Sequence, residues 1–239
     1  MVVRLGETLD LPLRERNDLL VAAGFAPLFR ESGLSAPQMA QIRVVLTAIL
    51  KQQEPYPAIV LDRRWDIQMM NDAAIRTFGR FIDVEGLAQP VNLVRLMFDP
   101  AGMRPFVKNW AAVSAGLLHR LRREAVGGIL DRATTTLLSE VAGDAGQPRA
   151  VPASTPNPDL LPVIPVELEK DGLALRFFSA VTTLGTPKDV TSEEIRVECF
   201  FPVDDATAKT SARLAAEDRG STRAASEPGR GNARADTED

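Results

Sequence analysis

The sequence contains few of the residues on which metal sites and many active sites depend. It has one cysteine, Cys199, and one histidine, His119, among 239 residues. A single cysteine excludes a disulfide bond within the chain and favours a reducing compartment. A histidine metal cluster or a Ser-His-Asp triad would rest on His119 alone, and no neighbouring motif supports either one. We therefore expect no metal, no cofactor and no catalytic activity.

Long apolar runs and an excess of positive charge are also missing. No apolar stretch approaches the ~18 residues that a membrane-spanning helix needs, so we expect no membrane partner and a cytoplasmic location. The net charge of −4 and the pI of about 5.3 argue against a strongly basic nucleic-acid binder. Hydrophobic residues make up 45% of the chain, which is enough for a sizeable core.

The most informative stretch runs from residue 54 to residue 79. Two short apolar runs, 58–62 and 65–70, flank a polar break and predict a strand, a tight turn and a second strand. Asn71 follows as a strong N-cap, and apolar residues then recur at helical spacing as far as Phe78. A strand, strand, helix opening is typical of sensor domains that hold a small molecule between a curved sheet and short helices.

The rest of the chain completes an α+β domain. We expect a short helix capped by Asn92 and longer helices over residues 12–23, 38–51, 106–125 and 131–141. Three further strands are expected over residues 163–170, 173–184 and 195–201, the first two joined by the hairpin signal Asp171-Gly172. This order predicts a five-stranded antiparallel sheet with helices on one side. The 38–51 helix is amphipathic, and its apolar face needs either the sheet or a second subunit as its partner.

These elements divide the chain into four parts. Residues 1–25 are expected to contain a helix but are too few to form a hydrophobic core of their own. Residues 26–53 form a linker and the amphipathic helix, and residues 54–204 form the main domain. In residues 205–239 there are no aromatic residues, and Leu214 is the only large aliphatic one. We expect this tail to be disordered and its removal to leave stability unchanged.

The chain resembles a known family in several stretches that occur in the right order. The stretches are residues 11–27, residues 54–58 with Arg64, Trp65 and Asn71, residues 92–100 with Asn109 and Trp110, and residues 183–191 with 198–204. They resemble transcriptional regulators of the XRE helix-turn-helix family that carry an MmyB-like ligand-binding domain. That domain is PAS-like, and its pocket is associated with lipophilic or fatty-acid-like molecules.

The resemblance implies a transcriptional regulator that senses such a ligand and works as a homodimer or as a heterodimer with full-length relatives. Residues 1–25 resemble only the end of the family's DNA-binding domain, which implies remnant helices of an N-terminally truncated helix-turn-helix. We therefore do not expect this chain alone to read a DNA sequence. The alternative is a dimerisation or interaction module that binds neither a ligand nor DNA directly.

Six residues are candidates for binding the ligand. Arg95 lies on an otherwise apolar short helix and is expected to hold a carboxylate, unless it is a structural arginine. The basic run 119–123 is either a solvated helix face or a second site for an acidic headgroup, through Arg120 or Arg123. An apolar cavity would be lined by aromatic residues, which are otherwise ordinary core: Trp65, Phe78, Phe98, Trp110 and Phe178.

Overall fold

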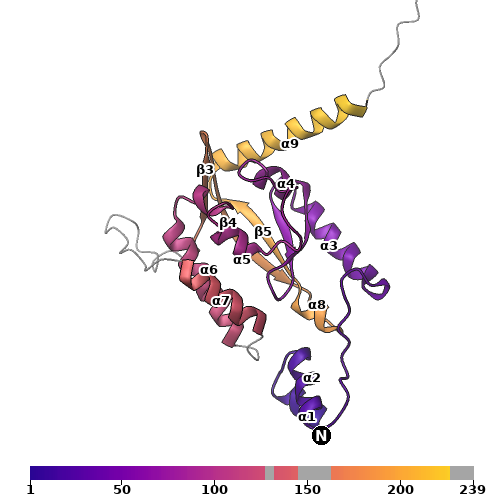
Figure 1. Ribbon diagram of the computed structural model, residues 1–239. Helices are drawn as coiled ribbons and strands as arrows, with labels where there is room; N and C mark the ends of the chain where they lie inside the picture. Colours follow the sequence, from indigo (N-terminus) through magenta and orange to yellow (C-terminus); the bar gives the residue numbers. More distant parts are fainter. Residues whose placement is uncertain (127–131, 145–162, 227–239) are drawn as a thin grey trace, which may run out of the picture.

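A five-stranded antiparallel sheet forms the centre of the computed structural model, which describes residues 1–126, 132–144 and 163–226 (Figure 1). The strand order is β2-β1-β5-β4-β3, so the two strands that begin the domain lie beside the strand that ends it. The prediction of an α+β domain built on this sheet is confirmed. The strands are β1 (Ala58–Leu61), β2 (Ile67–Met70), β3 (Val166–Lys170), β4 (Leu173–Thr183) and β5 (Arg196–Pro202).

The β3–β4 hairpin forms where its turn residues predict it. Asp171 and Gly172 have φ values of 49° and 80°, and two successive left-handed residues are what a two-residue hairpin turn requires. The turn aligns Lys170 with Leu173 and sets the register of the two strands. In the sheet's centre, β1 pairs with β5 and brings Ala58 opposite Cys199.

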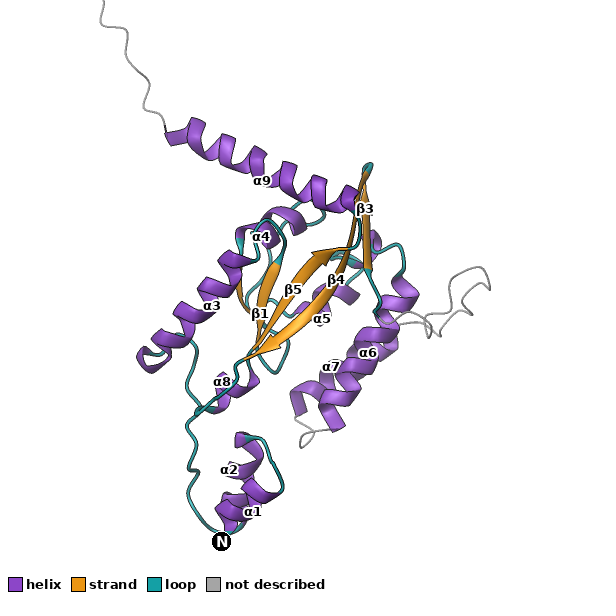
Figure 2. Ribbon diagram, turned by 180° about the vertical axis from the view of Figure 1, so that it is seen from behind, coloured by secondary structure: helices purple, strands orange, loops and turns teal. Residues whose placement is uncertain are grey.

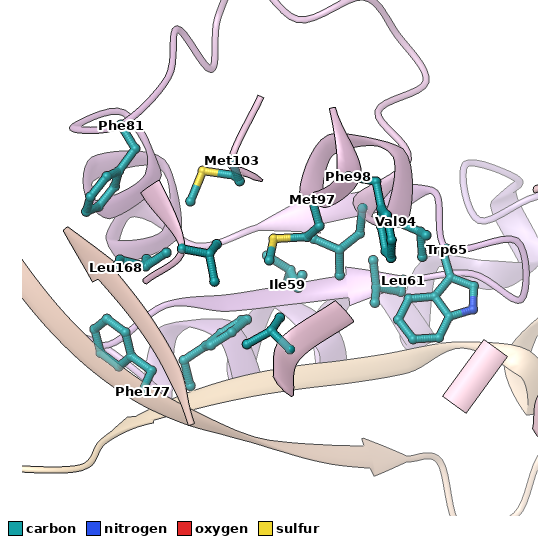
Figure 3. Packing of buried hydrophobic residues seen from close by; sticks show 14 of the residues in the cluster. Ile59, Leu61, Trp65, Phe81, Val94, Met97, Phe98, Met103, Leu168 and Phe177 are labelled. Atoms are coloured by element: carbon teal, nitrogen blue, oxygen red, sulfur yellow. The ribbon is translucent and has the colours of Figure 1, made fainter. Parts of the chain in front are cut away.

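Helices cover the face of the sheet that carries the larger core. They are α4 (Asp72–Phe78), α5 (Leu93–Phe98), α6 (Trp110–Val126) and α7 (Arg132–Asp144), with a 3-10 turn at Arg104–Phe106. Figure 3 shows this core, in which Ile59 and Leu61 of β1 face Val94 and Met97 of α5. Trp65 lies at one end of the cluster, and Phe81 and Phe177 lie at the other. The expected layer of helices is therefore present.

A further helix, α3 (Ala40–Gln52), lies on the opposite face of the sheet (Figure 2). It follows a 3-10 turn at Pro37–Met39. Leu46 and Leu50 of α3 are buried against Val60 of β1 and Val197 of β5. The partner of the amphipathic helix, which the sequence left open, is therefore the sheet itself. The sheet has a helix on its second face as well as the layer that the sequence predicted.

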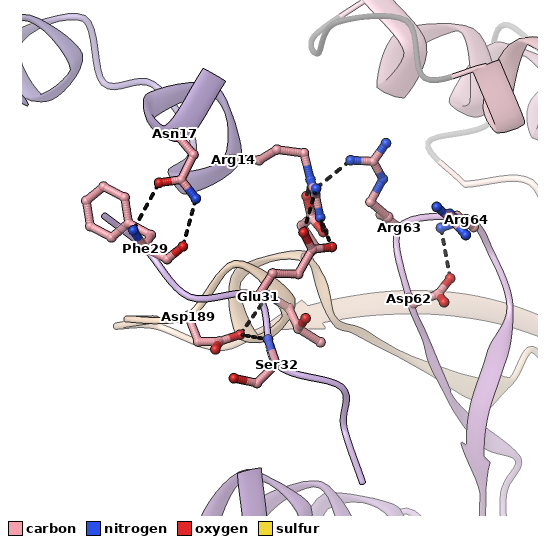
Figure 4. Close-up of polar contacts among 11 residues, drawn as sticks. Arg14, Asn17, Phe29, Glu31, Ser32, Asp62, Arg63, Arg64 and Asp189 are labelled. Carbon is pink, nitrogen blue, oxygen red and sulfur yellow. Dashed lines mark hydrogen bonds and ion pairs between the residues drawn. The ribbon is translucent and has the colours of Figure 1, made fainter. Parts of the chain in front are cut away.

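Two N-terminal helices, α1 (Val2–Thr8) and α2 (Leu13–Ala22), are attached to the domain by polar contacts (Figure 4). Arg14 pairs with Glu31 and, at 2.6 Å between Nε and Oε1, with Glu194 of the short helix α8 (Val190–Glu194). The hydrogen bond from Arg14 holds the pKa of Glu31 below its ordinary value. This attachment joins the N-terminal helices to the helix that directly precedes β5.

The C-terminal part of the chain differs from its prediction. Residues 205–226 form a long helix, α9 (Asp205–Ser226), and the expected disorder is wrong for this range. The remainder of the expected tail, residues 227–239, lies outside the described residues. Leu214 and Ala215 are buried where α9 packs on α4, β4 and β5. Asp204 Oδ1 accepts a hydrogen bond from the Thr207 amide at 2.8 Å and caps the helix. The burial of these two side chains, together with the cap, thus helps to dock a helix that consists mostly of small and polar residues.

Among the described residues, none of the helices combines the length and the apolar character that crossing a membrane requires.

Candidate ligand-binding cavity

An apolar cavity of about 400 Å³ lies between the sheet and the helices α4, α5 and α6. This volume is within the range of about 300–1,000 Å³ that is common for small-molecule sites. Every strand except β1 contributes to its wall. The apolar side chains that line it include Ile67, Phe78, Ile82, Leu93, Leu96, Met97, Met103, Val113, Leu117, Leu168, Phe177 and Phe200.

Two asparagines hold the helices over this cavity. The side chain of Asn71 accepts hydrogen bonds from the amides of Ala58 and Ala74, both at 2.9 Å, and so ties the start of α4 to β1. Asn92 caps α5 through the amide of Arg95 and donates to Asp66 at 2.8 Å. Both asparagines are buried, so these hydrogen bonds replace the water that the side chains lose on folding. The caps thus fix the position of the cavity's cover as well as the start of each helix.

Gly116 keeps part of the cavity open. It lies on the side of α6 that faces the cavity, where a β-carbon would approach Ile164 Cδ1 to 3.5 Å. A single β-carbon would fit there in ordinary contact, but a longer side chain would extend into the cavity. The absence of a side chain therefore leaves space between α6 and the segment that leads into β3.

The cavity also has a charged end. Arg120 of α6 and Glu198 of β5 both line it, and Arg120 Nη1 lies 3.2 Å from Glu198 Oε2. The side chain of Glu198 is 8% exposed and that of Arg120 is 26% exposed. The Arg120 guanidinium also lies 4.3 Å from the ring centroid of Trp65, within the range of a cation–π contact. One ion pair, held by the sheet and by one helix, therefore forms the charged part of a mostly apolar wall.

Cys199, the residue after Glu198, points to the other face of the sheet. It is buried beneath α3, among the apolar side chains of the smaller core cluster. Burial raises the pKa of the Cys199 thiol, and the negative charge of Glu198 raises it further. A neutral, buried thiol is a weak nucleophile, so this cysteine acts as a packing residue.

The predicted aromatic residues are divided among three environments. Phe78 lines the cavity. Trp65 and Phe98 belong to the fully packed core, and Trp110 contacts Phe98 edge-to-face with the ring centroids 4.9 Å apart. Phe178 is 36% exposed and stacks on Phe201, away from the cavity lining. The hydrophobicity of these residues did not show which of them line the cavity and which are packed in the core.

Arg95 does not line the cavity, so it is not placed to hold the carboxylate of a ligand bound there, as the sequence led us to expect. Its side chain is 56% exposed, and its guanidinium pairs with Glu140 of α7 at 3.0 Å. The buried residues of α5 are Leu93, Val94, Met97 and Phe98. This spacing covers one side of the helix and leaves position 95 on the other side. An apolar neighbourhood in sequence was thus a poor guide to the direction of this side chain.

Arg120 and Glu198 are the functional candidates that sequence reasoning did not bring together. Arg120 was named, with Arg123, as a second candidate for an acidic headgroup, and it lies three residues after Leu117, on the side of α6 that lines the cavity. Glu198 carried a similar signal, since it is a carboxylate between the apolar residues Val197 and Cys199 of the central strand. Buried charges of this kind usually have a partner, and that rule could have flagged the position.

We expect Arg95→Met to change neither stability nor ligand binding appreciably. An exposed ion pair contributes about 0–1 kcal/mol, and the side chain lies outside the cavity. Thermal melting with and without a long-chain lipophile measures both properties. Loss of ligand-induced stabilisation in this variant would mean that the ligand reaches the surface of α5.

One of three comparisons with known proteins, that with family models, agrees with the class of this site. The family model of the MmyB-like transcription regulator ligand binding domain matches residues 42–214. The comparison with curated proteins gives no match. Among solved structures, the PAS domain from Bordetella pertussis BvgS is similar to this chain at 13% sequence identity, with a TM-score of 0.33. The similarity covers 75% of this chain and 98% of that chain.

Proposed function

Because the chain belongs to the family of MmyB-like transcription regulator ligand-binding domains, we propose that it senses a small lipophilic molecule in the cavity between the sheet and α4–α6. The observation that carries the proposal is the cavity of about 400 Å³, whose wall is apolar except for a few polar groups. Such a wall is suited to binding and positioning a ligand. The family consists of ligand-binding domains and is not a class of enzymes.

The wall favours an elongated ligand with an apolar tail and one polar end. The tail would lie among side chains such as Phe78, Met97 and Phe200, where it gains the free energy of leaving water. The polar end would lie near Arg120 and Glu198, where hydrogen-bonding groups are available. A fatty acid fits this description, and so does an uncharged compound of the same shape.

We propose that the ligand acts on the rest of the regulator through β5 and α8. Glu198 lies in β5, and α8 ends directly before this strand. Glu194 of α8 pairs with Arg14, and Glu193 accepts a hydrogen bond from the Leu13 amide of α2 at 2.6 Å. A shift of β5 would therefore reach the N-terminal helices and, through them, the DNA-binding function of the regulator. The ligand can shift β5 only if it binds the shifted arrangement and the unshifted arrangement with different affinities.

A cavity-filling variant tests the proposal. Gly116→Leu should place a leucine side chain in the cavity and abolish the rise in melting temperature that a long-chain alcohol or acid causes in the wild type. Ligand at about 100 times its dissociation constant adds about 2.7 kcal/mol of stability, which is a shift of several degrees. Differential scanning fluorimetry measures the shift in both proteins.

Ala115→Leu is the matched control, because it adds the same side chain to the same helix at an exposed position. It should keep the full response to the ligand. An equal response in Gly116→Leu would place the ligand outside the cavity. If neither a long-chain acid nor a long-chain alcohol stabilises the wild type, the proposed sensing function is wrong.

A further inference from the structure

The charges in the cavity wall cancel. Among the described residues that line it, Arg120 and Glu198 are the charged ones, and they are paired with each other. The remaining polar side chains of the described wall, Gln68, Gln89 and Ser179, are neutral. A ligand therefore contacts a wall with no net charge. Arg120, the arginine of this wall, is already paired with the carboxylate of Glu198.

Glu198 is held firmly in this position. Its strand lies between β1 and β4, with Ile59 beside it on one strand and Val181 on the other. Arg120 approaches from α6, and Arg196 lies two residues earlier on β5, with its guanidinium 4.8 Å from the Trp65 ring centroid. Arg196 also donates to the backbone carbonyl of Asp62 at 3.0 Å, at the end of β1. A buried carboxylate in a central strand cannot swing into water to make room for a second one.

A ligand carboxylate would therefore have to share Arg120 with Glu198. The attraction to the guanidinium would be offset by repulsion between two carboxylates only a few ångströms apart in a partly buried site. A hydroxyl or primary amide avoids this repulsion. Its oxygen can accept from Arg120, and its hydrogen can be donated to Glu198 or to Ser179 Oγ.

We infer that the cavity selects lipophiles with an uncharged end group that both donates and accepts hydrogen bonds, and that Glu198 is the residue that rejects acid anions. This inference rests on the proposed function, since it concerns the same cavity. It narrows the ligand class from lipophiles in general to alcohols and amides. The selectivity is the difference between the affinity for an uncharged lipophile and the affinity for an acid anion. It arises because the negative charge of Glu198 repels the anion.

The test compares decan-1-ol, decanamide and decanoate near neutral pH, by calorimetry on the full chain. In the wild type, the alcohol and the amide should bind about tenfold or more tightly than the acid. Glu198→Gln removes the negative charge, keeps the shape and can still accept from Arg120. It should reverse the preference in favour of the acid, because Arg120 then has no anionic partner in the wall.

Glu169→Gln is the control for net charge, because it makes the same substitution at a half-exposed position on β3. It should keep the wild-type order of affinities. The comparison within the wild type decides the question even if Glu198→Gln fails to fold. A wild type that prefers decanoate, or a folded Glu198→Gln with unchanged order, overturns the inference.

The outcomes also separate this inference from the proposed function. If all three probes bind the wild type equally and Gly116→Leu binds none, the cavity is a lipophile site without the selectivity that we infer. If none of the probes binds the wild type, both proposals fail together.

Discussion

Replacing Trp65 with alanine is expected to lower the free energy of unfolding by about 3–5 kcal/mol. The indole is 1% exposed and packs in the main core at the end shown beside Leu61 in Figure 3. It also contacts the guanidinium groups of Arg120 and Arg196. Its removal would leave a cavity and withdraw a surface against which both arginines pack. Chemical denaturation followed by far-UV circular dichroism measures the change.

The backbone at Trp65 adds a reason for this size of effect. Its φ is 68°, a left-handed conformation that is unfavourable for a bulky residue. The conformation is held by the burial of the indole and by hydrogen bonds of the Trp65 amide to the Asp62 carbonyl and of the Leu93 amide to the Trp65 carbonyl. Alanine retains the backbone cost and loses the packing that offsets it.

The chain's other tryptophan provides the comparison. Trp110 Nε1 is buried, and no hydrogen-bond partner for it occurs within the described part of the chain. Trp110→Phe removes that unsatisfied donor and keeps an aromatic ring against Phe98, so we expect a change below about 1 kcal/mol. A loss in Trp65→Ala no greater than this would show that the indole of Trp65 is not the packing anchor described here.

Deleting residues 205–239 is expected to lower the melting temperature by about 6–12 °C, because the loss of α9 costs at least about 3 kcal/mol. The deletion removes the buried side chains of Leu214 and Ala215 and uncovers parts of α4, β4 and β5. It also removes the Thr207 hydroxyl that accepts a hydrogen bond from the Arg176 amide at 3.0 Å. Differential scanning calorimetry at matched protein concentration gives the midpoint.

Two neighbouring positions on α9 distinguish burial from charge. Leu214→Ala should lose about 2–4 kcal/mol, since the leucine is 4% exposed. Arg213→Ala should lose less than about 1 kcal/mol, because Arg213 makes an exposed ion pair with Glu217 one turn away. A deletion variant that melts like the full chain would mean that α9 does not dock on the sheet in solution.

Local signals in the sequence determined where most elements begin, end and turn. Asn71 and Asn92 cap the helices predicted for them, and Asp171-Gly172 forms the predicted hairpin turn. The strand predicted over residues 195–201 forms β5, in which Val197 and Cys199 face the same side of the sheet. These signals depend on contacts between residues a few positions apart, so a single sequence contains all the information that they need.

Weak local signals were overridden by packing. The scarcity of apolar residues in α9 predicted disorder. Composition does not show that its one leucine, Leu214, is buried in the folded protein. Helix α1 was not predicted at all. For Arg95, the sequence showed apolar neighbours, while the side of α5 that faces the core was decided by how Leu93 and Met97 dock.

The candidate site belongs almost wholly to the tertiary structure. The sequence by itself determined an α+β domain with an antiparallel sheet, and a family resemblance that pointed to a lipophilic ligand. Arg120 and Glu198 are 78 positions apart, and only the docking of α6 over the sheet brings their side chains together. The reason is physical: strand order and helix docking join distant residues, and the charge balance of a cavity exists only after they have met.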